Sequence, residues 1–195
     1  TVATADDLVI AYYDITNRAN TTYEYAIVPI FDQIEGSFYI SEVKTNYQGL
    51  FVVDRDNIFS TELDVQISEK RNKPRSIITP LNRKYPYIIS NGTSNYDSGS
   101  VSAEWLQYDS GNDDWDIDGG RDFVVAFKDF LNDGLPKLLK YEDGRMWLID
   151  ISSSEVTDTE DEMHLQVHTS FDWTEIGNCD SADDLCANGF IDIDQ

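Results

Sequence analysis

Short runs of alternating apolar and polar residues, each closed by Gly, Asp or Asn, recur along this chain. From Gly36 onward they read "SFYISEVK", "GLFVVDR" and "FSTELDVQIS". Alternation with a period of two places every second side chain on one face of a β-strand, and β-branched and aromatic residues favour that conformation. This pattern predicts an antiparallel meander and therefore a mainly β fold, built as a β-sandwich or a small barrel.

The first 35 residues have the same character but a different context. Two strands are predicted over residues 7–14 and 21–31, joined by the polar turn "ITNRAN". The stretch "TTYEYAIVPIFDQIEGSF" resembles the last strands of an immunoglobulin-like or fibronectin-like module. We therefore expect residues 1–35 to be N-terminal strands left from such a module, and residues 36–195 to form the main β domain. The first residue is Thr rather than Met, which indicates a processed chain or a portion of a longer one.

One segment predicts a helix, "RDFVVAFKDFLNDG". Its apolar residues recur with a period of 3.6 and so form a single stripe; they are Phe123, Val124, Phe127, Phe130 and Leu131. Gly134 lies just beyond the stripe as a terminator. An amphipathic helix is therefore expected over about 121–132.

Beyond the helix the sequence predicts a hairpin and a last long strand. "PKLLKYEDGRMWLIDIS" carries Asp143-Gly144, the signal of a type I′ turn between two apolar runs. In "EMHLQVHTSFDWTEIG" the two histidines of the chain, His164 and His168, fall on the polar face. On a strand they lie roughly 13 Å apart, at about 3.3 Å per residue, which is too far for one zinc ion.

The acidic loop "GNDDWDIDGG" places Asp114, Asp116 and Asp118 at alternate positions before a glycine. This is the first half of a calcium-binding EF-hand loop, but position twelve, where a bidentate Glu is needed, is Val125. Carboxylates just before a helix also cap its amides and oppose its dipole, which explains the acids without a metal. Two interpretations remain open, a calcium site at these three aspartates or a helix entry with no cofactor.

The charge of the chain excludes some partners. It holds 14 basic and 37 acidic residues, a formal charge of −23 and a pI near 4.1, which repels phosphate backbones. Apolar runs fall short of the roughly 18 residues of a membrane span. We expect neither direct nucleic-acid binding nor membrane insertion. The basic patch "EKRNKPRS" is either a solvated loop or a docking surface for an acidic neighbour.

No motif for nucleophilic, metal-dependent or nucleotide chemistry occurs in the sequence, so no enzymatic activity is predicted. Cys179 and Cys186 are either a local disulfide or two free thiols. Trp105, Trp147 and Trp173 lie in strand patterns and are expected in the core, whereas Trp115 is the tryptophan expected at the surface. A glycan-binding module using Trp115 and the three aspartates is the alternative function, and a glycan-cleaving enzyme with paired carboxylates is a weaker one.

The C-terminal two thirds resemble a known family. "PYIISNGTSNYDSGSVSAEWL", "FKDFLNDGLPKLLKYEDGRMWLIDIS" and "SFDWTEIGNCDSADDLCANGFIDID" are similar to structural tail and baseplate proteins of tailed phages, over about residues 74–193. These motifs are turn and core residues, so they say nothing about chemistry. The acidic loop at 109–118, the N-terminal strands and the two cysteines depart from the family pattern.

The resemblance implies a distal-tail or tail-tube-like domain, a β-sandwich or barrel flanked by one helix, located in the virion. It implies a structural protein that forms a ring with copies of itself, contacts other phage tail proteins and joins tail tube to tip. If the ring encircles DNA, acidic residues in its lumen would repel the phosphates and keep the genome from adhering.

Overall fold

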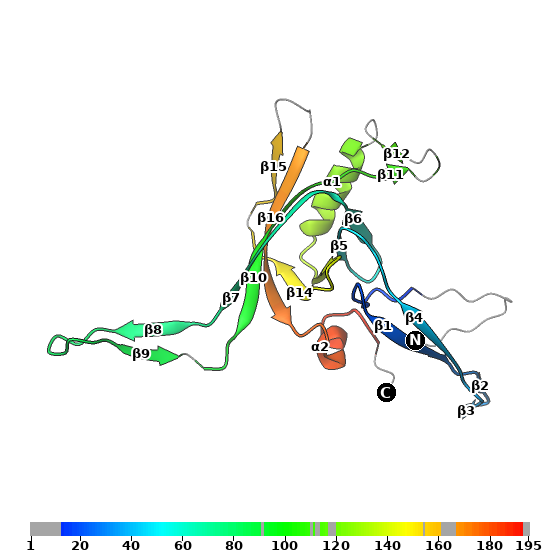
Figure 1. The fold of residues 1–195 in the computed structure, drawn as a ribbon, viewed down its shortest axis with the longest axis horizontal. Coiled ribbons are helices and arrows are strands. Elements are labelled where there is room, and N and C mark those ends of the chain that lie inside the picture. The colour runs from blue at the N-terminus through cyan, green and yellow to red at the C-terminus, as the bar shows by residue number, and fades with distance from the viewer. Residues whose placement is uncertain are drawn as a thin grey trace.

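The computed structural model describes residues 13–90, 92–109, 111, 114–116, 120–153, 155–160 and 167–192 of the chain. Its largest element is one antiparallel sheet of eight strands, shown in Figure 1. From one edge to the other the strands are β6(Ile58–Thr61), β5(Leu50–Val53), β13(Lys137–Tyr141), β14(Met146–Ile151), β16(Val167–Gly177), β10(Tyr96–Glu104) and β7(Leu63–Asn72), and β15(Thr157–Glu160) also pairs with β16. The mainly β, antiparallel fold class predicted from the sequence is confirmed.

Alternate residues of the middle strands enter two separate hydrophobic clusters, so both faces of this central sheet are buried there. Along β14, Trp147 and Ile149 belong to one cluster, whereas Met146 and Leu148 belong to the other. The period of two puts successive side chains on opposite faces, and here both sets are apolar. The sheet therefore needs a covering element on each side.

Helix α1(Gly120–Leu131) covers the first face, and its bounds agree with the predicted 121–132 within one residue at each end. Phe127 is fully buried and stacks on Trp105, with ring centroids 3.8 Å apart. Trp147 and Trp173 are also buried, so the three tryptophans expected in the core lie there. Aromatic packing between the helix and the sheet forms the centre of this cluster.

A second helix, α2(Ala182–Ala187), packs on the opposite face and was not predicted from the sequence. The Ser181 side chain caps it by accepting a hydrogen bond from the Asp184 backbone N–H at 3.3 Å. Leu185 and Cys179 join the second cluster, packed with strand residues such as Leu148. Six residues are less than two helical turns, too few to produce a recognisable apolar stripe.

The predicted hairpin forms between β13 and β14, but its turn is not type I′. A type I′ turn needs a positive φ at both central residues. Gly144 has φ 94°, whereas Asp143 is not among the positive-φ residues. Tyr141 N–H bonds to the Arg145 carbonyl, which leaves a three-residue loop over 142–144. The structure thus has the three-residue hairpin with glycine in the left-handed position.

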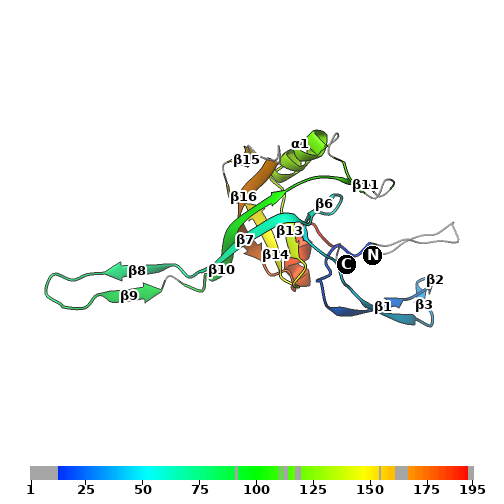
Figure 2. The same cartoon turned by 45° about the horizontal axis from the view of Figure 1, so that its top comes forward.

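Two hairpin arms project from the central sheet. The N-terminal arm, residues 22–44, pairs β1(Thr22–Ile27) with β4(Tyr39–Lys44) and carries β2(Ile30–Phe31) and β3(Ile34–Glu35) at its tip. The basic arm, residues 70–90, extends β7 into β8(Arg75–Ile78) and returns through β9(Tyr87–Ser90). Figures 1 and 2 show the two arms leaving the sheet on opposite sides.

The base of the N-terminal arm is tied to the rest of the chain. Arg18 hydrogen-bonds Asp180 and the Gly144 carbonyl, and the Asn20 side chain donates to the Glu142 carbonyl at 2.9 Å. β1, from the predicted module remnant at 1–35, pairs with β4 beyond that boundary. The division of the chain at residue 35 stays a prediction.

Candidate functional site

The basic arm stands clear of the core. All of residues 73–90 except Pro80 are exposed. The exposed set includes large apolar side chains on both strands and in the connecting loop, and these are Ile77, Ile78, Leu81, Tyr85, Tyr87, Ile88 and Ile89. A two-stranded ribbon without a covering layer is marginally stable on its own, and a contiguous exposed apolar surface usually marks an interaction site. This arm is the first candidate interaction surface.

Its charge is opposite to that of the remaining chain. Residues 70–90 hold six basic residues and no acidic one, which leaves 8 basic and 37 acidic residues elsewhere. The basic residues are Lys70, Arg71, Lys73, Arg75, Arg83 and Lys84. Arg83 lies over the ring of Tyr87 at 4.3 Å, so cations and aromatics form one mixed surface. The segment predicted as either a solvated loop or a docking surface is therefore part of a projecting β-ribbon.

The N-terminal arm is the second exposed surface. Every residue from Ala26 to Lys44 is exposed. Its large apolar side chains are Ile27, Val28, Ile30, Phe31, Ile34, Phe38, Tyr39, Ile40 and Val43. Residues 22–44 hold four acidic residues and one basic residue, so this arm combines apolar surface with negative charge. The two arms match each other in apolar character and are opposite in charge.

Two of the three aspartates of the acidic loop lie among the described residues. Asp114 is exposed on β12(Asp114–Trp115), which pairs with β11(Tyr108–Asp109), and its carboxylate accepts the Trp115 N–H at 2.8 Å. Asp116 follows on the chain and is partly buried. Asp118 lies outside the described residues. A calcium ion at Asp114, Asp116 and Asp118 stays a prediction.

A groove of about 620 Å³ lies beside this small hairpin. Trp115 lines it and packs edge-on against Tyr108, with ring centroids 5.3 Å apart. Trp115 is half-buried, in line with its predicted place outside the core. Flat aromatic rings beside a groove offer stacking surfaces to a ligand.

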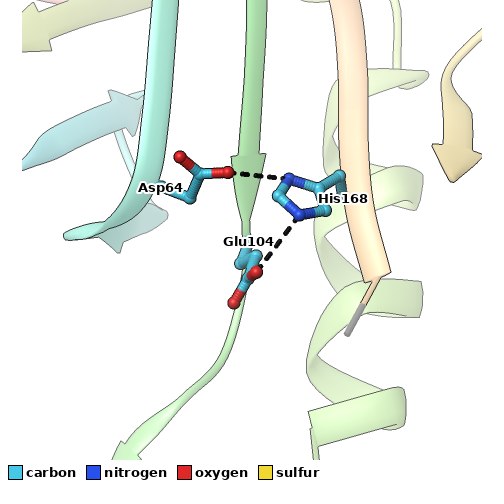
Figure 3. A group of neighbouring side chains, drawn as sticks. All are labelled: Asp64, Glu104 and His168. Atoms are coloured by element: carbon cyan, nitrogen blue, oxygen red, sulfur yellow. Dashed lines mark ion pairs between the residues drawn. The ribbon is translucent and has the colours of Figure 1, made fainter. Parts of the chain in front are cut away.

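Three ligand-type side chains meet on the central sheet at a place that the sequence did not predict. Asp64 of β7, Glu104 of β10 and His168 of β16 come from three neighbouring strands (Figure 3). The Nε2 atom of His168 lies 3.1 Å from the Glu104 carboxylate. Its Nδ1 atom lies 3.7 Å from the Asp64 carboxylate. One ligand atom from each residue lies within 4.8 Å of the others.

Strand register explains how these three side chains meet. Glu104 is directly opposite His168 on one side and Leu63 on the other. A register shift inserts an extra residue in β7 there, and Asp64 takes a left-handed backbone conformation with φ 41°. The bulge turns Asp64 toward the neighbouring carboxylate. The sequence carries no signal for this meeting, because it depends on pairing between strands 40 and more residues apart.

Both cysteines are free thiols, with Cys179 buried and Cys186 partly buried. Burial raises the pKa of the Cys179 thiol above its ordinary value, although the nearby Arg18 guanidinium acts in the other direction. Cys179 packs in the second hydrophobic cluster, and its thiol donates to the Met146 carbonyl at 3.1 Å. Over the described part of the chain, neither helix is long and apolar enough to cross a membrane.

The comparisons with known proteins give structural neighbours only. No protein-family model matches the chain, and no curated protein matches it. A chain in the tail of an empty gene transfer agent particle with C6 symmetry superimposes with a TM-score of 0.37 and 15% identity, over 67% of this chain and 92% of that one. A chain of the virion of a native gene transfer agent particle gives a TM-score of 0.37 and 13% identity over the same shares.

Proposed function

We propose that this protein is a structural subunit of a phage-type tail or baseplate, without enzymatic activity, which forms a ring with copies of itself and joins tail tube to tip. The observation that carries the proposal is the pair of exposed apolar arms of opposite charge. The resemblance of residues 74–193 to tail and baseplate proteins supplies the kind of particle. The site of action is then the virion, and the partners are further copies and other tail proteins.

The placement of the arms favours a head-to-tail contact. The basic arm and the N-terminal arm leave opposite sides of the central sheet, as Figures 1 and 2 show. A contact between two different surfaces of the same protein repeats from copy to copy and closes into a ring when the rotation allows it. We therefore pair the basic arm of one copy with the N-terminal arm of the next.

Charge selects the orientation of this contact. Two basic arms repel each other, and so do two N-terminal arms, whereas one of each attracts. Burial of the apolar side chains on both arms supplies the main stabilisation. The remaining surface stays strongly acidic, which would keep a DNA backbone from adhering to the ring.

Charge reversal on each arm tests the proposal. Light scattering measures the molar mass of the natural protein and of each variant, at 50 mM and at 500 mM salt. We expect assemblies of several copies for the natural protein. Reversal of the basic arm in Arg75→Glu/Arg83→Glu/Lys84→Glu is expected to give monomers. Reversal of the N-terminal arm in Glu24→Lys/Glu35→Lys/Glu42→Lys is expected to do the same, and an equimolar mixture of the two variants to assemble again.

The control is Arg121→Glu, an exposed reversal on α1 away from both arms, which should leave the assembly intact. A monomeric natural protein at working concentration would count against a ring. Failure of the mixed variants to assemble, while each alone stays folded by circular dichroism, would count against pairing between the two arms.

A glycan-binding module is the second candidate, favoured by the half-buried Trp115 beside Tyr108 in the groove. If a sugar ring stacks on Trp115, a glycan identified on an array should quench the tryptophan fluorescence of the protein. The Trp115→Ala variant should no longer bind that glycan. A natural protein that stays monomeric and binds glycan in this way supports this candidate over the tail subunit.

A further inference from the structure

We propose that Asp64, Glu104 and His168 form a binding site for one divalent transition-metal ion, with zinc as the best match. The site is independent of the arms and goes beyond the structural role proposed above. It lies at the end of β7 and β10 that is remote from the basic arm, so the ion would join three strands of the central sheet.

The donor set of the cluster suits zinc. One imidazole nitrogen and two carboxylate oxygens are ligands that zinc takes at about 2.0–2.2 Å. Ligand atoms around a tetrahedral ion at that distance are separated by roughly 3.4 Å. The Nε2 to Glu104 separation is 3.1 Å, and the three ligand atoms all lie within 4.8 Å. The Asp64 carboxylate lies 3.7 Å from the other ring nitrogen, Nδ1, so the exposed Asp64 side chain must change rotamer to share one ion with Nε2 and Glu104.

The two carboxylates of the cluster need positive charge nearby. The Glu104 side chain is only 8% exposed, so its carboxylate needs a positive partner. Among the described residues, no Lys or Arg side chain pairs with Glu104 or Asp64. A neutral imidazole has one N–H donor, yet both ring nitrogens of His168 face carboxylate oxygens. An imidazolium would donate to both carboxylates, and a divalent cation bound to one ring nitrogen would also balance their charge. The Zn²⁺ titration distinguishes the two.

The identity of the ion follows from ligand type and exposure. An imidazole with two carboxylates suits zinc better than magnesium or calcium, which prefer oxygen ligands throughout. The Asp64 side chain is 56% exposed, so solvent reaches the cluster and a water molecule can complete four-coordination. The bulge in β7 holds this open side in place, because it fixes the backbone of Asp64 next to Glu104.

The test uses the full chain freed of metal with a chelator, then titrated with Zn²⁺ by calorimetry and with Co²⁺ by visible absorption. We expect one Zn²⁺ per chain, a higher melting temperature with Zn²⁺, and the strong d–d bands of tetrahedral Co²⁺. Asp64→Asn and His168→Gln should each weaken Zn²⁺ binding at least tenfold. Because Glu104 is buried and its replacement risks the fold, the exposed Asp64 is the decisive position.

The matched control is Asp114→Asn/Asp116→Asn, which removes two carboxylates from the acidic loop and should leave Zn²⁺ affinity unchanged. Unchanged Zn²⁺ affinity in both Asp64→Asn and His168→Gln overturns the proposal. So does a stoichiometry well below one ion per chain. Neither result depends on whether the protein forms rings, because the assembly is measured separately by light scattering on the arm variants.

Discussion

The guanidinium of Arg71 forms two parallel hydrogen bonds with the carboxylate of Asp97, from Nε to Oδ1 and from Nη2 to Oδ2, each 2.7 Å long. The two residues are directly opposite on β7 and β10, where the basic arm leaves the central sheet. The Asp97 side chain is 5% exposed, and its backbone N–H donates to Glu175 of β16 at 2.7 Å. This bidentate pair joins β7 to β10 at the base of the arm.

Asp97→Asn is expected to destabilise the protein. The amide offers one acceptor oxygen and turns an N–H group toward the guanidinium, so a buried donor is left unsatisfied. We expect a loss of about 1–3 kcal/mol in the free energy of unfolding, measured in urea at pH 7. The control is Asp192→Asn, which breaks the exposed pair with Arg55 and should leave the urea midpoint unchanged. An equal midpoint shift in both variants would contradict the role of Asp97.

The same pair predicts a dependence on acid. The hydrogen bonds from Arg71 lower the pKa of Asp97 below its ordinary value, against the effect of burial. A lowered folded-state pKa means that the unfolded chain binds the proton first as pH falls. The stability that ionised Asp97 contributes to the fold is therefore fully present above the unfolded-state pKa of about 3.9. It is lost as pH falls through the lower folded-state pKa. Urea unfolding from pH 6 to pH 2 measures this effect. The difference in free energy of unfolding between the natural protein and Asp97→Asn should become smaller as pH falls below about 3.9. A gap that stays constant to pH 2 would contradict this assignment.

The helix contact predicts a large effect of a single core truncation. Phe127 is fully buried between Trp105 and Phe171, so Phe127→Ala leaves a cavity. The expected cost is about 3–5 kcal/mol in the free energy of unfolding. Val125, on the same helix, is 47% exposed, and Val125→Ala should cost no more than about 0.5 kcal/mol. Similar unfolding midpoints for both variants would mean that α1 does not pack as described.

The sequence predicted those elements whose signal is local. The apolar stripe of α1 and the alternation of β16 follow from neighbours within a few residues, and Phe127 and Trp173 lie in the core as expected. The type I′ turn predicted at Asp143-Gly144 was wrong, because this dipeptide occurs in both two-residue and three-residue hairpin loops. Helix α2 was missed because Ala182–Ala187 is too short for a periodic pattern.

The candidate sites were harder to predict because they depend on the arrangement of distant segments. Nothing in the alternation of residues 70–90 indicates that this ribbon leaves the sheet, although its excess of basic residues was visible. Asp64, Glu104 and His168 are far apart in sequence, and only the register of three strands brings them together. Polar residues on the wet face of a strand are common, so no single one of them indicated a site.

A buried lysine predicts a gain of stability in mild alkali. Lys140 donates to the Ile15 carbonyl at 3.1 Å and to Asn17 at 2.6 Å, and desolvation lowers the pKa of its amine to about 8. Between that pKa and the ordinary lysine pKa of 10.5 the unfolded chain binds more protons than the folded one. Stability contributed by this group should therefore rise with pH over that range, by no more than about 1.4 kcal/mol per pH unit.

The measurement compares the natural protein with Lys140→Met in urea at pH 7.5 and pH 9.5. The Cys179 thiol, whose pKa is raised by burial, makes stability fall with pH, but it does so in both proteins. The difference between their free energies of unfolding therefore reports on Lys140. A direct check follows the ¹³Cε shift of Lys140 with pH, with an expected midpoint near 8. A midpoint above 10 would contradict the prediction.

At Gly99 the backbones of β7 and β10 approach too closely for a side chain. A Cβ placed there would lie 1.9 Å from the Ser68 carbonyl oxygen and 3.0 Å from the Trp173 ring, so β7 and β10 must separate to admit it. Gly99→Ala is expected to cost about 3 kcal/mol or more in the free energy of unfolding. The neighbouring Ser100→Ala loses one hydroxyl pair with Ser68, at 2.8 Å, and should cost about 1 kcal/mol. If Gly99→Ala unfolds at the same urea concentration as Ser100→Ala, the close approach of the two strands at this position is wrong. Since β7 and β10 continue into the basic arm, Gly99→Ala should also weaken the assembly more than Ser100→Ala does.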